Sequence, residues 1–158
     1  MGFLRFIFIV SILLSSCTRT SNSEGGLSAN KLNSADSIEF IAKTILPPII
    51  DEAISLCIED SPYKIEDSLI ISKDAVLTIQ AGVVVLMGDS ARLKVFGGLN
   101  LLGRTDNKIQ IRPIKHNGYF HSITFDSTSH SNTIEYTTII DGLLVSINSE
   151  LVLSNVRY

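Results

Sequence analysis

Two short stretches of the chain, AVLTIQAGV at residues 75–83 and ARLKVFGGL at residues 91–99, follow nearly the same pattern. Each places Ala, Leu, a β-branched residue and Gly at matched positions. Aliphatic residues at every second position predict a strand with one buried face. The glycine that follows predicts a tight corner, where a side chain would collide with neighbouring backbone. The two stretches therefore predict a repeat of a short strand and a corner.

Short runs of the same kind continue from residue 63 to the end of the chain. They read YKI, LII, VLTI, VVVLM, RLKV, LNLL, KIQI, SITF, TIEY, LLVSI and LVL. No run is followed by a helical pattern, so βαβ units are excluded and the fold class is all-β. Three runs together span about 22 to 25 residues, for example from LTI to LNL, which is a solenoid-like repeat length.

The length of the runs decides between two all-β architectures. Sandwich strands usually have about five or six residues and are joined by hairpins. Most runs here are shorter, and Asp141-Gly142 is the main hairpin signal. We therefore predict a short right-handed parallel β-helix of about three to four coils over residues 61–158. A β-sandwich is the alternative.

The N-terminus, MGFLRFIFIVSILLSSC, has the features of an export signal. Arg5 precedes an apolar run of about ten residues, which is shorter than the roughly 20 needed to span a bilayer. Leu14, Ser15, Ser16 and Cys17 then resemble the lipobox of a bacterial lipoprotein. That resemblance implies a signal peptide over residues 1–16 and acylation of Cys17 with palmitate-type chains. It also implies a cell-envelope location, with the outer membrane favoured because Thr18, not Asp, follows the cysteine. An ordinary secretory signal is the alternative.

The segment between the signal and the strands has two parts. Residues 17–36 are rich in Ser, Asn, Thr and Gly, which predicts a flexible tether. Over residues 37–60, isoleucines at helical spacing predict a small helical cap, interrupted at Pro47-Pro48. Cys57 is expected to pack as a small buried side chain within this cap.

Residues 61–113 resemble the opening coils of β-helix repeat proteins of the pectin-lyase-like superfamily, which are secreted or lipid-anchored. The matching phrases are Ser61-Pro62-Tyr63, Leu77 to Gly82, Leu93 to Gly97, and Gly103 to Ile111. The resemblance implies the fold, and it implies as one possibility a polysaccharide lyase that holds Ca²⁺ between carboxylates. One departure is that the usual tryptophan is absent, with Phe120 in its neighbourhood.

The residues that could carry chemistry do not form a recognisable active site in the sequence. The acidic residues are expected to lie singly beside turns; they include Glu66, Asp67, Asp89, Asp106, Asp126, Glu135 and Asp141. The spacing of His116, His121 and His130 matches no compact zinc pattern. Ser122, Ser127, Ser129 and Ser131 lie in no nucleophile-elbow motif. No catalytic, metal or cofactor site is therefore predicted.

Charge and patterning indicate a binding or structural role. The net charge of −3 gives no electrostatic case for nucleic acid. Arg92, Lys94 and Arg112 could form a basic ladder for an acidic glycan on adjacent strands. We expect a lipid-anchored module that binds a polysaccharide or a surface protein, with a lyase or hydrolase as the alternative. Aliphatic residues persist in SELVLSNVRY at residues 149–158, so we expect the last coil to be covered by self-association or by sequence missing from this chain.

Overall fold

The computed structural model describes residues 40–158. The predicted signal peptide, the predicted lipobox with Cys17 and the predicted tether all lie outside the described residues. Every strand pair in the described part is parallel, and the strands form three five-stranded sheets. The chain is thus an all-β parallel solenoid, which excludes the β-sandwich alternative.

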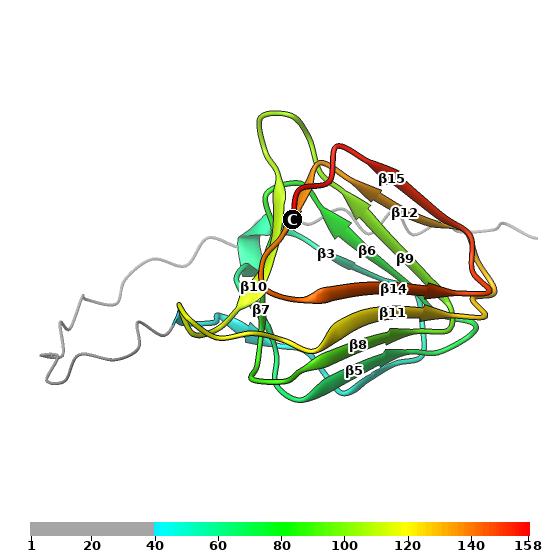
Figure 1. The fold of residues 1–158 in the computed structure, drawn as a ribbon, viewed down its shortest axis with the longest axis horizontal. Coiled ribbons are helices and arrows are strands. Elements are labelled where there is room, and N and C mark those ends of the chain that lie inside the picture. The colour runs from blue at the N-terminus through cyan, green and yellow to red at the C-terminus, as the bar shows by residue number, and fades with distance from the viewer. Residues whose placement is uncertain (1–39) are drawn as a thin grey trace, which may run out of the picture. The chain divides into compact units, whose positions relative to one another are not determined.

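The three sheets form the three sides of each coil, as Figure 1 shows. The first sheet contains β1 (Thr44–Ile45), β4 (Tyr63–Ile65), β7 (Val84–Met87), β10 (Ile109–Pro113) and β13 (Thr137–Ile139). The second contains β2 (Ile49–Ile50), β5 (Ser68–Ile71), β8 (Arg92–Val95), β11 (Ser122–Asp126) and β14 (Leu143–Ile147). The third contains β3 (Ile54–Leu56), β6 (Val76–Gln80), β9 (Gly98–Leu102), β12 (Asn132–Glu135) and β15 (Leu151–Ser154).

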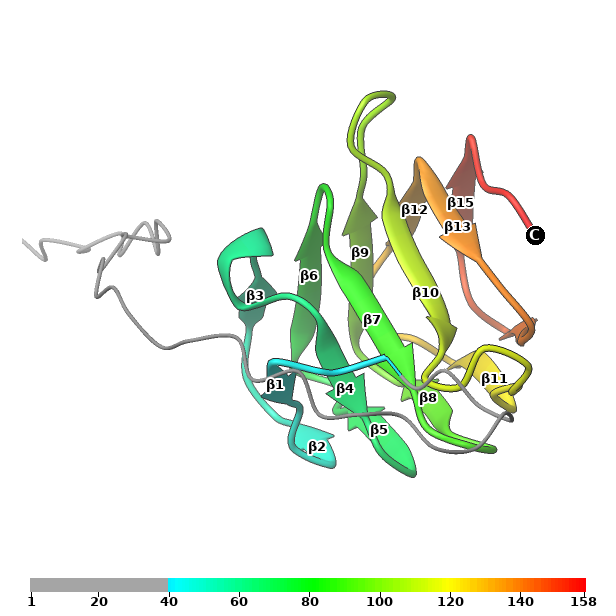
Figure 2. The same ribbon diagram turned by 90° about the vertical axis from the view of Figure 1, so that its left-hand side faces the viewer.

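Consecutive strands therefore visit the three sheets in turn and make five coils, which we number from the N-terminus. Coil 1 is β1–β3 and coil 5 is β13–β15. The expected number of three to four coils is too low, because the solenoid begins at Thr44 and not at residue 61. Figure 2 shows the coils stacked side by side along the first sheet.

Stacking of like residues in register builds the core. On the third sheet, each inward residue lies against its counterpart in the next coil, in the order Leu56, Ile79, Leu101, Ile134 and Leu153. Leu77 pairs with Leu99, 22 residues further along, which confirms the repeat length expected from LTI and LNL. Asn100 pairs with Thr133, 33 residues on, because loops at residues 103–108 and 114–121 lengthen the intervening chain. The first of these loops projects at the top of Figure 1.

The two similar phrases occupy β6 and β8, which belong to different sheets. They are therefore a strand-level repeat, as the sequence predicts, and they do not stack on each other. A Cβ on Gly97 would lie 2.1 Å from the carbonyl oxygen of Ala75 and 2.2 Å from that of Ser72. No side chain could be accommodated there without moving backbone, so the corner requires glycine.

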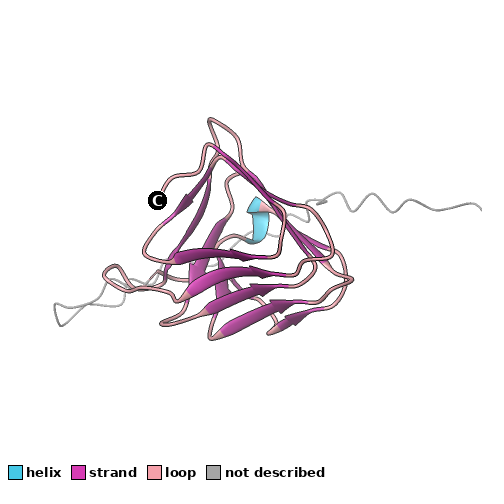
Figure 3. Ribbon diagram, turned by 45° about the vertical axis from the view of Figure 1, so that its right-hand side comes forward, coloured by secondary structure: helices cyan, strands magenta, loops and turns pink. Residues whose placement is uncertain are grey.

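The helical cap predicted for residues 37–60 is wrong over residues 40–60, the part that the structure describes. This part forms β1, β2 and β3, followed by one 3₁₀ turn, η1 (Ile58–Asp60), which Figure 3 draws in cyan. Pro47 and Pro48 cannot sit inside a helix, and β-branched isoleucines favour strands. Pairing of these strands with coil 2 decides the outcome. Within residues 40–158, no helix has the length and apolarity to cross a membrane.

Tyr63 holds the link between coils 1 and 2. Its hydroxyl accepts a hydrogen bond from the Cys57 amide at 3.2 Å and donates one to the Cys57 carbonyl at 3.0 Å. Burial raises the pKa of the Tyr63 phenol, so the group keeps the proton that it donates. Cys57 is buried here, as the sequence predicts, although not on a helix.

Residues 40–43, which we call the strap, cross the outer face of the first sheet (Figure 2, cyan). The Phe40 amide donates to the Ile114 carbonyl at the end of β10, and the Lys43 amide donates to the Pro62 carbonyl before β4. The Arg112 guanidinium lies 3.9 Å from the centre of the Phe40 ring, a cation–π contact. Leu86 is only 1% exposed, although it points outward between the inward-facing Val85 and Met87. The strap thus connects coil 4 to coil 2 from outside.

Asn132 is a fully buried polar residue that bonds to three successive coils. Its Oδ1 accepts from the Leu99 amide in coil 3 at 2.9 Å. Its Nδ2 donates to the Glu150 carbonyl, just before β15, at 3.1 Å, and to Thr128 and His130 nearby. The side-chain amide therefore satisfies backbone groups at a corner where regular strand pairing stops.

The last coil is incompletely covered in the structure. Leu153 is 48% exposed, although Ile134, on which it stacks, is 0% exposed. Leu143, Ile147 and Val152 of the same coil are also exposed. Arg157 already begins to pair with Thr137 and Ile139 of β13.

Candidate functional site

Charged side chains from three coils surround one hollow of about 390 Å³ at the end of the first sheet. We call it the charged hollow. Lys64, Glu66 and Asp67 come from coil 2, Asp89 comes from coil 3, and Lys115 follows β10 in coil 4. The expectation that acidic residues lie singly is therefore wrong for these three carboxylates. Their common cause is the coil repeat, since Asp67 and Asp89 are 22 residues apart and Tyr63 pairs with Val85 at the same interval.

The charges of this hollow are largely paired within it. Lys64 lies 3.2 Å from Glu66, and Lys115 lies 2.5 Å from Asp89. Exposed ion pairs of this kind contribute little to stability, and they occupy the carboxylates that a cation would need. In the part of the chain that the structure describes, no three His, Cys, Asp or Glu side chains are placed to hold a metal ion. The hollow can therefore offer charge and hydrogen bonds to a polar ligand, but not a ready cation cage.

A second hollow, of about 310 Å³, has a mainly apolar lining. We call it the aromatic corner. Tyr119, Phe120 and His121 enter it from the loop before β11, in coil 4. Asp141, Gly142 and Leu143 enter from the corner between β13 and β14, in coil 5.

The aromatic corner depends on a close contact between a glycine and a ring. Phe120 is buried, and a Cβ built on Gly142 would lie 2.0 Å from its ring. The Phe120 amide donates to the Asp141 carbonyl at 3.0 Å, so the two coils are joined at this point. Asp141-Gly142 is thus a coil corner and not the hairpin turn that the dipeptide suggests.

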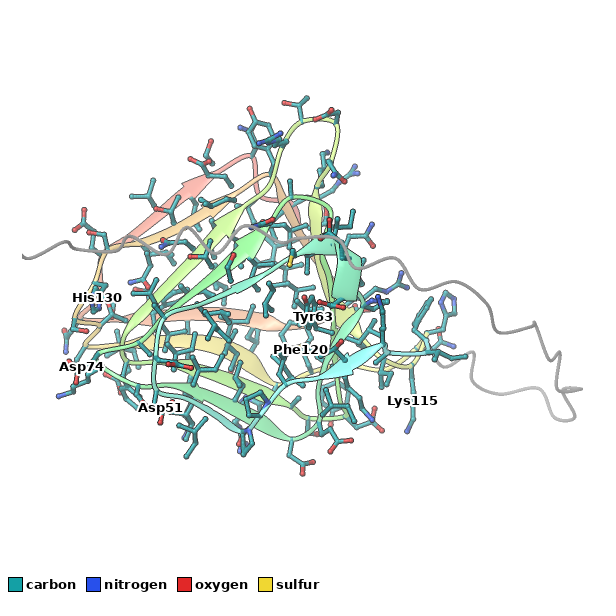
Figure 4. The ribbon with its side chains drawn as sticks, turned by 180° about the vertical axis from the view of Figure 1, so that it is seen from behind. Asp51, Tyr63, Asp74, Lys115, Phe120 and His130 are labelled. Atoms are coloured by element: carbon teal, nitrogen blue, oxygen red, sulfur yellow. The ribbon has the colours of Figure 1, made fainter. Side chains whose placement is uncertain are left out.

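The histidines and serines considered in the sequence do not come together. His121 Nδ1 lies 3.1 Å from Ser122 Oγ, and His130 Nδ1 lies 2.9 Å from Ser129 Oγ, each pair being sequence neighbours. The Ser129 hydroxyl donates to the Lys73 carbonyl, so its proton is directed away from the imidazole. His116 belongs to the loop between β10 and β11. Figure 4 shows His130 near Asp74 on one side of the solenoid and Lys115 on the other.

The basic ladder suggested by Arg92, Lys94 and Arg112 does not form. Arg92 and Lys94 lie on β8 in the second sheet, whereas Arg112 lies on β10 in the first. The Arg112 guanidinium instead packs over the Phe40 ring of the strap. The spacing of these residues does not show which sheet each belongs to, because the loops at residues 103–108 and 114–121 shift β10 and β11 relative to the 22-residue repeat.

Comparison with protein-family models, with curated proteins and with solved structures gave no match. The assignment as a parallel β-solenoid therefore rests on the strand pairing of this chain.

Proposed function

We propose that this chain is a bacterial envelope lipoprotein that displays a β-solenoid as a binding or structural module. Leu14-Ser15-Ser16-Cys17, directly after a short apolar run, is the observation that carries the proposal. Lipid at Cys17 would hold the module at a membrane surface, because each buried methylene contributes about 0.8 kcal/mol. The outer membrane is the proposed location, and the module's ligand would be a polysaccharide or a surface protein.

The described domain supports a binding role through its surface. Both hollows lie at coil corners, and each combines residues from neighbouring coils. Solenoids of this kind use repeated coils to build extended binding surfaces. The similarity to pectin-lyase-like repeat proteins belongs to the same proposal, since it rests on sequence phrases alone.

Loss of the anchor should follow from Cys17→Ser expressed in a bacterial host. Metabolic labelling with a fatty-acid analogue should mark the wild-type chain and leave Cys17→Ser unlabelled, and the variant should leave the membrane fraction. Cys57→Ser is the matched control. It changes a cysteine that lies beside Tyr63 in the solenoid and leaves Cys17 in place, so this variant should still be labelled. Equal labelling of wild type and Cys17→Ser would refute the lipoprotein proposal.

A polysaccharide lyase or hydrolase is the second candidate, favoured by the three carboxylates of the charged hollow. We expect no cleavage of polygalacturonate, with or without Ca²⁺, because Glu66 and Asp89 are paired with lysines and calcium needs six to eight oxygen ligands. Absorbance of unsaturated products measures this. Calcium-dependent release that disappears in Asp67→Asn would establish the enzyme instead.

Self-association through the exposed face of coil 5 is also part of the proposal. Exposed strand edges and aliphatic side chains favour association with a further strand. Light scattering of the purified chain, compared with Leu153→Lys, would measure it.

A further inference from the structure

We infer that the aromatic corner binds one neutral pyranose unit of a glycan. The inference rests on the proposed binding role. It adds the place on the solenoid where the ligand binds and the absence of charge on that ligand. It places the ligand between coils 4 and 5, in a hollow whose lining shares no residue with that of the charged hollow.

The size and lining of the corner suit a single sugar ring. A volume of about 310 Å³ lies at the lower end of small-molecule sites. Tyr119 and Leu143 are each 63% exposed, and they come from different coils onto the same hollow. Contiguous exposed apolar surface is one mark of a ligand-binding groove. A pyranose has one face of C–H groups that can cover such side chains while its hydroxyls stay in water.

The rigid floor of the corner explains why the hollow persists. Phe120 is buried and lies against Gly142, where no side chain fits. Backbone hydrogen bonds fix both of its neighbours: the Tyr119 carbonyl accepts from Ser90, and the His121 amide donates to Ala91. Such a preformed site binds without the entropic cost of ordering its own backbone.

Polar groups beside the apolar lining define the charge of the ligand. The Asp141 carboxylate is the one acidic group among the residues that line the corner, and no lysine or arginine lines it. His121 also lines the corner, and its Nδ1 lies 3.1 Å from the Ser122 hydroxyl. A carboxylate accepts hydrogen bonds from hydroxyls but repels another carboxylate. The corner should therefore accept neutral hexoses and disfavour uronic acids.

Saturation-transfer NMR of the full chain in detergent micelles tests this directly. The probes are the methyl glycosides of glucose, galactose, mannose and N-acetylglucosamine, with methyl glucuronide and methyl galacturonide as anionic partners. At least one neutral glycoside should receive saturation, and its uronide partner should bind more weakly. Tyr119→Ala should raise the dissociation constant about fivefold, because the aromatic contact is lost. Tyr158→Ala, which removes an exposed tyrosine outside the corner, should leave it unchanged.

Asp141→Asn separates charge from shape. Asp141 has a positive φ of 54°, which Asn tolerates well, so the corner should keep its conformation. The variant should bind the uronide as well as the neutral partner. Absence of saturation on every neutral glycoside, equal affinities in wild type and Tyr119→Ala, or stronger binding of uronides to the wild type would each overturn the inference. The NMR experiment measures sugar binding and does not depend on the fatty-acid label. A negative result in either experiment therefore leaves the result of the other experiment valid.

Discussion

Leu101→Ala should lower the free energy of unfolding by about 3 kcal/mol, which lies within the usual range for a buried leucine. Leu101 is fully buried in coil 3, between Ile79 and Ile134 of the adjacent coils. Removing its side chain leaves a cavity that the stacked strands cannot close, because their spacing is fixed by hydrogen bonds along the sheet. The shift of the urea midpoint, followed by far-ultraviolet circular dichroism, measures the loss.

Leu153→Ala is the matched control for this substitution. Leu153 occupies the same inward row two coils later, but it is about half exposed. Its truncation should cost about 1 kcal/mol, since less surface leaves an apolar environment. Equal losses at the two positions would mean that coil 5 is covered as fully as coil 3 in solution.

Asn132→Ala should lower the free energy of unfolding by about 2 to 3 kcal/mol, because a buried amide partner is lost. The Leu99 amide would lose its acceptor, and the carbonyls of His130 and Glu150 would lose a donor. The cost is that of burying unsatisfied backbone groups, which exceeds the net value of the hydrogen bonds themselves. Urea unfolding again provides the measurement.

Asn100→Ala provides the control for Asn132. Asn100 lies on the outer face of β9, between the inward-facing Leu99 and Leu101. Its replacement should change stability by less than about 0.5 kcal/mol, as is usual for surface positions. If the two alanine variants were equally stable, the amide of Asn132 would not be needed to hold the corner.

The sequence predicts the solenoid well where strand and corner signals coincide. Most runs from Tyr63 onward match strands, and the interval from Leu77 to Leu99 matches a coil. Coil 1 was missed because isoleucines around Pro47-Pro48 also fit a helical spacing, and only pairing with coil 2 selects the strands. β13 was missed because it follows β12 after a single residue, Tyr136, whose positive φ makes the corner without glycine.

The two hollows were harder to predict because each needs the register between coils. The sequence shows the 22-residue interval between Asp67 and Asp89. It does not show that Lys115 lies beside them, because the insertion at residues 103–108 shifts β10 relative to that interval. The aromatic corner was hidden by Asp141-Gly142, which reads as a hairpin turn in isolation. A local signal cannot show that this dipeptide lies against Phe120.

The strap also determines how a mechanical load would enter the solenoid. In a stack where each coil contacts only its neighbours, tension on the N-terminal side would peel coil 1 away first. Here the backbone of the first described residue, Phe40, is hydrogen-bonded to that of Ile114, which follows β10. The backbone of Lys43 is hydrogen-bonded to that of Pro62. A pull arriving from before residue 40 therefore acts first on the Phe40–Ile114 bond and the Phe40–Arg112 contact, in coil 4. Drag on a module held by its N-terminal side would therefore be borne first by coil 4, before coil 1 was strained.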